Sequence, residues 1–288
     1  MKAVAEAVAA LGEPVFMKAV GNDPSPSAMI ARWRHGSAEL DFTPSDTVMV
    51  SISLQGGQQA RHQTGNAPSH ASVRVGSVSV LPAHQRTQIA VQGEADILQI
   101  FLREPFLDAA VDGQFACLAL FNSHDSELRA AAMQLFVAAT RGDRDDSLLL
   151  ETGVHRMAAG LLNHRESPTP RPARGGLGSA ACRRVDDLIT GALQDTAAPT
   201  PTLGQLAAAA SLSVNHFIRA FRQQTGVTPH RHIVLRRLER GLALLKRPGV
   251  SVAEVADDAG FATPAHFVAT FRRTMGVTPG ALREALQH

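Results

Sequence analysis

The chain has 288 residues, of which 44% are hydrophobic and 19% charged, and its formal net charge is +2 at pH 7. This length accommodates two domains that each bury a core, and the composition is globular, which excludes a wholly disordered chain. The sequence has no run of about 18 apolar residues, so we expect no membrane span and no membrane partner. Glu6 interrupts the apolar N-terminal stretch, which predicts a short amphipathic helix or a frayed end rather than a signal peptide.

The two cysteines, Cys117 and Cys182, are far apart and have no second Cys or His at metal-ligand spacing. Isolated thiols favour a reducing compartment over a disulfide framework, so we expect a cytoplasmic protein with buried, structural cysteines. A nucleophilic Cys117 is an alternative, but Phe115-Ala-Cys-Leu118 lacks the strand, elbow and helix context of a nucleophile and has no nearby base.

The stretch 29–102 predicts a small β-barrel or jelly roll, because short strand-like runs alternate with turn residues. The candidate strands are Ala28–Arg34, Thr47–Leu54, Ser72–Arg74, Ser77–Leu81 and Ile97–Phe101. The candidate turns are Gly56-Gly57, Gly65-Asn66 and Gln92-Gly93. A barrel of this size can hold one small molecule, and plain core is the alternative for every candidate lining residue. The candidates for an effector pocket are Trp33, Phe42, Met49 and Phe101.

The segment Val75-Gly-Ser-Val-Ser-Val-Leu-Pro-Ala83 resembles the strand and turn of a cupin barrel. Metal-binding cupins have a His at the fifth position after the proline and an HxH pair upstream. Here that position is Thr87, and no HxH pair precedes it. We therefore expect no metal and no other cofactor. The scattered histidines predicted as surface or structural residues are His35, His62, His70 and His84.

Three helices are predicted after the strands, at 105–111, 125–140 and 147–163. The apolar stripe of the third helix predicts either dimerisation through it or packing within the chain. The segment Glu166–Gly178 holds three prolines and three glycines in thirteen residues, which predicts a linker. The predicted domains are therefore an effector-binding or dimerisation domain at 1–165 and a second domain at 179–288.

A repeat dominates the second domain, because residues 206–229 return as residues 255–279. His216 matches His266, Phe217 matches Phe267, and Gly226-Val-Thr-Pro229 matches Gly276-Val-Thr-Pro279. Each copy predicts a short helix, a tight turn and a longer helix. Two copies are too few for a solenoid and instead predict a two-headed module.

Capping signals place both copies as helix-turn-helix motifs, at 202–225 and 251–275, joined by a long helix at 231–246. Thr202 and Ser213 are predicted N-caps, Ser251-Val-Ala-Glu254 is a capping box, and Pro264 fits the first position of a helix. Residues 174–288 hold 14 Lys and Arg against 8 Asp and Glu, net +6, whereas residues 1–173 hold 14 against 18, net −4. The basic half therefore suits a polyanion. The basic residues at 231, 236, 237, 240, 246 and 247 are expected chiefly on a solvated face, with some phosphate contacts.

The motif spacing, Gly260-Phe-Ala-Thr-Pro-Ala-His-Phe267, Phe271-Arg-Arg273 and Gly276-Val-Thr-Pro279 resemble the C-terminal domain of AraC/XylS transcription regulators, over residues 180–287. The resemblance implies an α+β protein, with a cupin-like barrel and following helices before an all-α domain. It implies a sequence-specific regulator without catalytic activity. Its implied partners are double-stranded DNA, a small-molecule effector, RNA polymerase and a second copy in a homodimer.

Carried onto this sequence, the family's base-contacting positions in the first recognition helix are Asn215, Ile218 and Arg219, with Arg222 towards the backbone. In the second helix they are Pro264, Ala265, Val268 and Ala269, with Arg272 and Arg273 at phosphates. Small side chains can touch a thymine methyl but cannot pair with guanine, so the second head is expected to discriminate weakly. Two rival functions are a metal-dependent cupin enzyme fused to a DNA-binding module, and an architectural protein that binds DNA without an effector.

Overall fold

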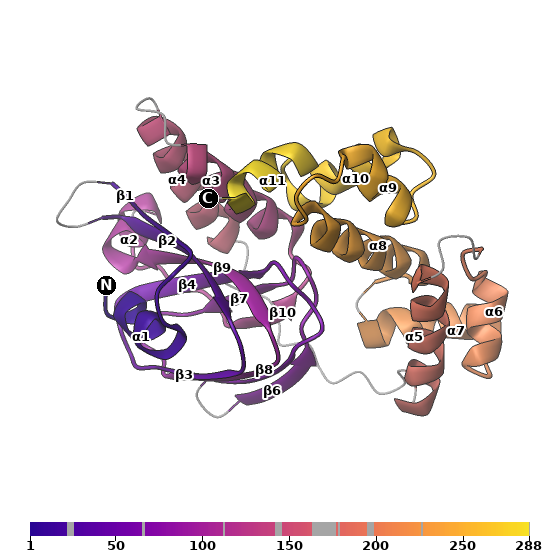
Figure 1. The fold of residues 1–288 in the computed structure, drawn as a ribbon. Coiled ribbons are helices and arrows are strands. Elements are labelled where there is room, and N and C mark those ends of the chain that lie inside the picture. The colour runs from indigo at the N-terminus through magenta and orange to yellow at the C-terminus, as the bar shows by residue number, and fades with distance from the viewer. Residues whose placement is uncertain are drawn as a thin grey trace. The chain divides into compact units, whose positions relative to one another are not determined.

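The computed structural model describes residues 1–21, 26–64, 67–111, 113–141, 146–162, 177, 179–194, 199–225 and 227–287. The chain forms two compact units, one of residues 1–167 with 271–288 and the other of residues 168–270, so the division falls within helix α10 (Pro264–Met275). The predicted α+β class is confirmed, with a strand-rich N-terminal part followed by helices (Figure 1). Apart from Leu177, the predicted linker at 166–178 lies outside the described residues.

The first unit contains two antiparallel sheets. The six-stranded sheet has the order β1 (Phe16–Val20), β2 (Ala28–His35), β9 (Ala95–Arg103), β4 (Thr47–Ser53), β7 (Val78–Leu81) and β10 (Leu120–Ser123). The four-stranded sheet has the order β3 (Ala38–Phe42), β8 (Thr87–Gln92), β5 (Gln59–Thr64) and β6 (Ala67–Ser72). Every pair is antiparallel, as the predicted barrel or jelly roll requires.

Strand alternation decides which residues face the space between the sheets. The odd-numbered residues of β9 face inward, and Phe101 packs there with Trp33 at a ring-centroid distance of 6.2 Å. The even-numbered residues face the opposite side of the sheet, where Asp96, Leu98 and Ile100 are buried. Helix α1 (Lys2–Leu11) closes one end of the inner core, and the Trp33 indole N–H donates to the Gly12 carbonyl oxygen at 3.1 Å.

The predicted strand Ser72–Arg74 is wrong. Ser72 ends β6, and Val73 instead exchanges backbone hydrogen bonds with Gly57 and Gln58. Strand β5 was not predicted because its inward residues include His62 and Thr64, which hide the apolar period. The turn at Gln92-Gly93 is confirmed, since Gly93 has a φ of +103° between β8 and β9. The predicted turn Gly65-Asn66 lies outside the described residues.

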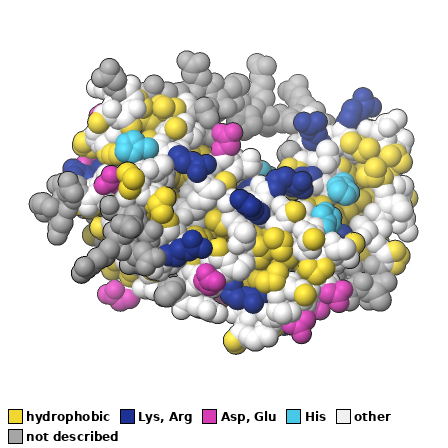
Figure 2. Space-filling model, turned by 90° about the horizontal axis from the view of Figure 1, so that it is seen from above, with side chains coloured by type: hydrophobic (Ala, Val, Ile, Leu, Met, Phe, Trp, Pro, Cys, Tyr) yellow, Lys and Arg dark blue, Asp and Glu magenta, His cyan; other side chains and the backbone are white. Residues whose placement is uncertain are grey.

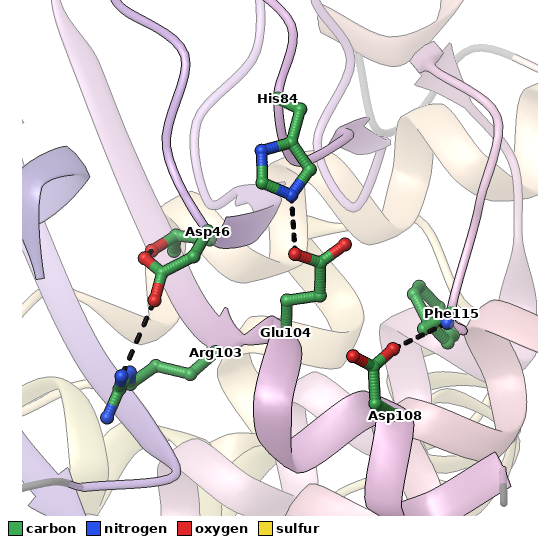
Figure 3. A network of polar contacts seen from close by, with 7 residues as sticks. Asp46, His84, Arg103, Glu104, Asp108 and Phe115 are labelled. Atoms are coloured by element: carbon green, nitrogen blue, oxygen red, sulfur yellow. Dashed lines mark hydrogen bonds and ion pairs between the residues drawn. The ribbon is translucent and has the colours of Figure 1, made fainter. Parts of the chain in front are cut away.

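Helices α2 (Glu104–Val111), α3 (Ser126–Arg141), α4 (Asp146–Leu162) and α11 (Pro279–Gln287) complete the first unit. Polar contacts hold the start of α2 at the end of β9 (Figure 3). The His84 imidazole lies 2.5 Å from the Glu104 carboxylate, the Arg103 guanidinium pairs with Asp46 at 3.4 Å, and Asp108 accepts the Phe115 backbone N–H at 2.6 Å. No helix in the described ranges is long and apolar enough to cross a membrane.

The second unit contains α5 (Ser179–Gln194), α6 (Leu203–Ala209), α7 (Val214–Thr225), α8 (Pro229–Leu245), α9 (Val252–Asp258) and the first part of α10. The predicted helix boundaries are confirmed within a few residues because caps mark the ends. Helix α8 approaches α10 closely, since a Cβ on Gly241 would lie 2.8 Å from a ring carbon of Phe267. The phenylalanines of both copies, at 217, 221, 267 and 271, are buried.

Candidate nucleic-acid interface and enclosed cavity

Both short helices of the repeat begin with a reciprocal capping box. The Gln205 backbone N–H donates to the Thr202 hydroxyl at 3.2 Å, and the Thr202 N–H donates to the Gln205 side chain at 2.8 Å. Ser251 and Glu254 make the same pair of bonds at 3.1 and 2.7 Å. The hydrogen bonds from Ser251 lower the pKa of the Glu254 carboxyl group, so it is charged beside the positive end of α9. The predicted caps at Thr202 and Ser251 are confirmed.

The two tight turns have the same geometry built on different residues. Ser211 has a φ of +57° in the first copy, and Gly260 has a φ of +78° at the matching position in the second. The next residues, Leu212 and Phe261, donate their N–H groups to Ala207 and Ala256 at 3.0 and 2.9 Å. A left-handed conformation costs an L-residue about 1–2 kcal/mol, so the first turn stores strain that glycine relieves in the second.

Helix α7 presents one polar face. Asn215, Arg219 and Arg222 are exposed at i, i+4 and i+7, and therefore lie along one side of the helix. Phe217 and Phe221 are buried on the opposite side, with ring centroids 5.4 Å apart. Ile218 is half-buried beside the polar face. The exposed face carries one amide and two guanidinium groups, the donors that read base edges and phosphates.

Helix α10 has exposed residues at the matching positions of its own face, but their side chains differ from those of α7. Ala265, Ala269 and Arg272 are exposed at the positions that match Asn215, Arg219 and Arg222. Pro264 and Arg273 are also exposed, and Val268 is half-buried like Ile218. The predicted start of the helix at Pro264 agrees with its observed position. The second face thus has two methyl groups where the first has an amide and a guanidinium.

Three arginines of α8 have structural contacts that sequence reasoning missed. Arg236 donates to the Thr190 hydroxyl and to Glu239 at 3.4 Å each, Arg240 bonds the Leu193 carbonyl oxygen, and Arg237 bonds the Thr200 hydroxyl. Burial lowers the pKa of Arg237. Their spacing of i and i+4 at 236 and 240 was the available signal, because it places both groups on the side of α8 that meets α5. Figure 2 shows Lys and Arg side chains at separate places on one face, among hydrophobic and acidic ones.

A partly open cavity of about 80 Å³ lies between the two sheets of the first unit. It exists because small side chains occupy inward positions, among them Ser51 and Ser53 on β4, Ala60 on β5 and Ala95 on β9. The wall on one side includes the His62 imidazole, stacked on the Phe121 ring at 4.6 Å with 10° between the planes. Its described lining contains no Asp, Glu, Lys or Arg.

The four predicted pocket residues do not line this cavity. Trp33, Phe42, Met49 and Phe101 are at most 5% exposed and form the hydrophobic core with α1. They face the same interior, but their large side chains fill it, whereas the serines leave space. The four predicted residues and the small residues that line the cavity therefore share one interior, and a role for these four in ligand binding stays a prediction.

Of the four histidines, His35 and His62 both line the cavity, and the other two lie apart from it. His70 is exposed, His84 pairs with Glu104, and burial lowers the pKa of His62. Among the described residues no group of three or more His, Cys, Asp or Glu could hold a metal ion. Burial raises the pKa of Cys117 to about 12, which keeps the thiol protonated and unreactive at neutral pH.

Two capped helix pairs, each with a tight left-handed turn and an exposed second helix, define a double helix-turn-helix domain. A family model described as "Helix-turn-helix domain" matches residues 206–285. The chain is 38% identical over 82 residues to the HTH-type transcriptional regulator MtrA of Neisseria gonorrhoeae, which covers 28% of this chain and 27% of that protein. Residues 206–285 therefore form a helix-turn-helix domain of the AraC type.

Two solved structures to which the chain is similar are the following. The DNA-binding domain of AdpA, in complex with a target DNA, has a TM-score of 0.31 and 32% identity, covering 35% of this chain and 89% of that one. ToxT from Vibrio cholerae has a TM-score of 0.36 and 13% identity, covering 91% of this chain and 100% of that one. The chain spans about a quarter to a third of the length of the curated relatives it matches.

Proposed function

We propose that the chain is a sequence-specific DNA-binding transcription regulator of the AraC/XylS type, controlled by a small molecule bound in its N-terminal barrel. The observation that carries the DNA-binding half is the exposed face of α7, with Asn215, Arg219 and Arg222 in one row. An α-helix fits the major groove, and these side chains carry the donors that match base edges and phosphates. The α10 face adds Arg272 and Arg273 at its C-terminal end. Its main role in the proposal is contact with the phosphates of the DNA backbone.

The effector half rests on how β9 divides its residues between two faces. Ala95 and Ile97 line the cavity, and Asp96 between them points to the other side of the sheet. There the Asp96 carboxylate holds Arg32, whose Nη1 donates to the Leu286 carbonyl oxygen in α11 at 2.9 Å. A ligand that moves Ala95 or Ile97 moves Asp96 with them. The DNA-binding part then responds through the C-terminal helix, as a shift between conformers.

Two further contacts tie the end of α10 to the rest of the first unit. Arg129 of α3 is 3% exposed, and it donates to the Thr274 carbonyl oxygen at 2.7 Å and to that of Gly76 at 3.0 Å. Gln134 donates to the Gly276 carbonyl oxygen at 3.0 Å. These bonds give changes in the barrel a second path to the residues that follow the α10 face.

Dimerisation and contact with RNA polymerase complete the proposal. In α4 the predicted stripe is divided: Val154, Met157 and Leu161 are fully buried within the chain, while Leu148 is 71% exposed. Leu149, which was not part of the predicted stripe, is 61% exposed beside it. The exposed leucines are the part of α4 available to a second copy. Sedimentation of the Leu148→Glu, Leu149→Glu double variant tests this: lower mass at equal protein concentration supports a dimer through α4, and unchanged mass contradicts it.

The experiment that tests DNA recognition is selection of binding sites by the full chain from random duplexes. We expect one strongly and one weakly specified half-site, with centres about 10 base pairs apart. A specificity ratio near one would instead indicate an architectural protein. Metal analysis of the purified chain separates the cupin-enzyme rival, which requires a stoichiometric metal.

Control by the barrel is tested by filling the cavity without a ligand. Ser53→Leu adds volume from β4, and we expect it to change the affinity for the selected site about fivefold or more. Gln92→Leu, on the exposed end of β8, is the matched control and should leave the affinity unchanged. An unchanged affinity in a folded Ser53→Leu chain would contradict control through the cavity.

A further inference from the structure

We infer that the barrel cavity takes a small uncharged molecule that carries hydrogen-bond donors. This inference rests on the proposed function for the site and adds the chemical class of the ligand. It follows from which polar atoms of the cavity wall have partners and which do not.

The unpaired polar atoms in the wall are acceptors. The Gln99 side chain is 2% exposed, and its amide nitrogen lies 3.4 Å from the Ser51 hydroxyl while its Oε1 has no hydrogen-bond partner. Gln58 is 4% exposed, and its amide nitrogen donates to the Glu94 carbonyl oxygen while its Oε1 also lacks a partner. Both side chains line the cavity. A buried carbonyl oxygen without a partner is destabilising, and a donor from a ligand would satisfy it.

His35 adds a third acceptor. Its Nδ1 lies 2.6 Å from the Gly36 carbonyl oxygen, and because a carbonyl only accepts, Nδ1 carries the proton. In the neutral ring Nε2 is then an acceptor, and this atom is buried without a partner in the cavity wall. The acceptors thus come from β2, β9 and the turn before β5, which surround the cavity from different elements.

The wall excludes charged ligands. No Lys or Arg in the described lining could neutralise an anion, and no Asp or Glu could neutralise a cation. Burial lowers the pKa of His62, so its imidazole is neutral and offers no positive charge. An uncompensated charge in a buried site costs far more than a hydrogen bond returns.

The cavity also sets the size. A volume of about 80 Å³ has room for about five water-sized groups, at roughly 15 Å³ each. The stacked rings of His62 and Phe121 form a flat wall against which an apolar or planar part can pack. Propionamide has this size, no charge and two N–H donors. Propionate has the same shape with a negative charge, and methyl acetate has it with no donor.

The experiment measures the melting temperature of the full chain with each of these three compounds. At about ten times its dissociation constant, propionamide should raise the melting temperature by about 3–6 °C, and propionate and methyl acetate should leave it unchanged. Equal shifts with all three, or none with propionamide, would overturn the assignment and indicate a cavity that holds only water.

Two variants show whether the cavity is the site. Gln99→Met keeps the side-chain volume but removes the acceptor, and Ser53→Leu keeps the acceptors but fills the space; both should abolish the propionamide shift. Gln92→Met, an exposed glutamine on β8, should retain it. A shift that persists in both cavity variants places the compound elsewhere and contradicts the inference.

DNA affinity in the same samples separates this inference from the proposed function. A propionamide shift that Gln99→Met removes, together with unchanged DNA affinity, supports the ligand class and contradicts effector control. A change in DNA affinity caused only by anions contradicts the ligand class and leaves effector control standing.

Discussion

The Arg32 guanidinium forms a bidentate ion pair with the Asp96 carboxylate inside the first unit. Its Nε and Nη2 atoms each lie 3.0 Å from one carboxylate oxygen, and the two side chains are 0% and 2% exposed. The third nitrogen, Nη1, reaches the Leu286 carbonyl oxygen, so one guanidinium joins β2, β9 and α11. A buried pair of this kind is costly to break from one side, because the remaining charge stays buried.

We expect Arg32→Met to lower the free energy of unfolding by about 3–5 kcal/mol. Arg34→Met is the matched control: Arg34 lies 3.5 Å from the same carboxylate but is 53% exposed, and solvent screening should limit its loss to about 1 kcal/mol or less. Urea unfolding of both variants checks the difference. Equal losses would show that burial of the pair is not the decisive factor. Arg32→Met combined with Asp96→Leu should recover part of the stability.

The α7 face predicts separate roles for its two arginines. Arg219→Ala should weaken binding to the selected site by about 1–3 kcal/mol and relax the preference at one base pair. Arg222→Ala should weaken binding to all sequences alike. It should also reduce the slope of log K against log salt concentration by about 1, the loss of one phosphate contact. Binding-site selection and anisotropy titrations at several salt concentrations check both. An unchanged base preference in Arg219→Ala would contradict base reading by that residue.

An arginine in the second helix-turn-helix motif, at the position that matches Arg219, should increase base discrimination by that motif. Ala269 lies where Arg219 lies in the first copy, and it is exposed. Ala269→Arg should therefore introduce a new preference for one base pair in the second half-site, of about 1–3 kcal/mol. Selection with Ala262→Arg, exposed in the turn before α10, is the control. The same logo for Ala269→Arg and the unsubstituted chain would argue against groove contact by α10.

His62 predicts how stability depends on pH. Burial holds its pKa in the folded chain below the usual 6.5, so the unfolded chain binds a proton first as the pH falls. The contribution of His62 is fully present above pH 6.5 and is lost as the pH falls towards the folded pKa. His62→Phe, which keeps a ring against Phe121, should reduce the slope of unfolding free energy between pH 7 and 5. The control His216→Phe, at an exposed histidine, should keep the slope. A slope that His62→Phe leaves unchanged would contradict the role of His62.

The unequal turns predict opposite effects of exchanging their residues. Ser211→Gly should stabilise the chain by up to about 1 kcal/mol, because glycine accepts a φ of +57° without strain. Gly260→Ser should destabilise it by about 1–2 kcal/mol, through the same strain and through a Cβ that would lie 3.3 Å from Nε of Arg237. Thermal unfolding measures both, and a stabilising Gly260→Ser would contradict the argument.

Local signals made the helical part predictable. The capping boxes at Thr202 and Ser251 and the proline at 264 act within one helical turn, so the residues themselves disclose them. The exposed row on α7 followed from the repeat and from helical spacing. Whether these side chains contact DNA stays a prediction.

Long-range features were not predictable in the same way. The pairing of Arg32 with Asp96 joins residues 64 apart, and neither residue stands out from other charges in the sequence. The cavity could not be predicted because it depends on small inward residues, such as Ser51 and Ser53, whereas sequence patterns point to large apolar residues as pocket lining. Strand β5 was missed for a related reason, since its buried histidine and threonine look like surface residues.

The approach of Gly276 to Ala130 bears on how the protein can be dissected. A Cβ at Gly276 would lie 2.6 Å from both Cα and Cβ of Ala130, so the end of α10 rests directly on α3. A fragment beginning at residue 179 would lose this contact and the bonds that Arg32, Arg129 and Gln134 give to residues 274–286. Binding measured on such a fragment would therefore report α10 without the contacts that residues 274–286 make in the whole chain.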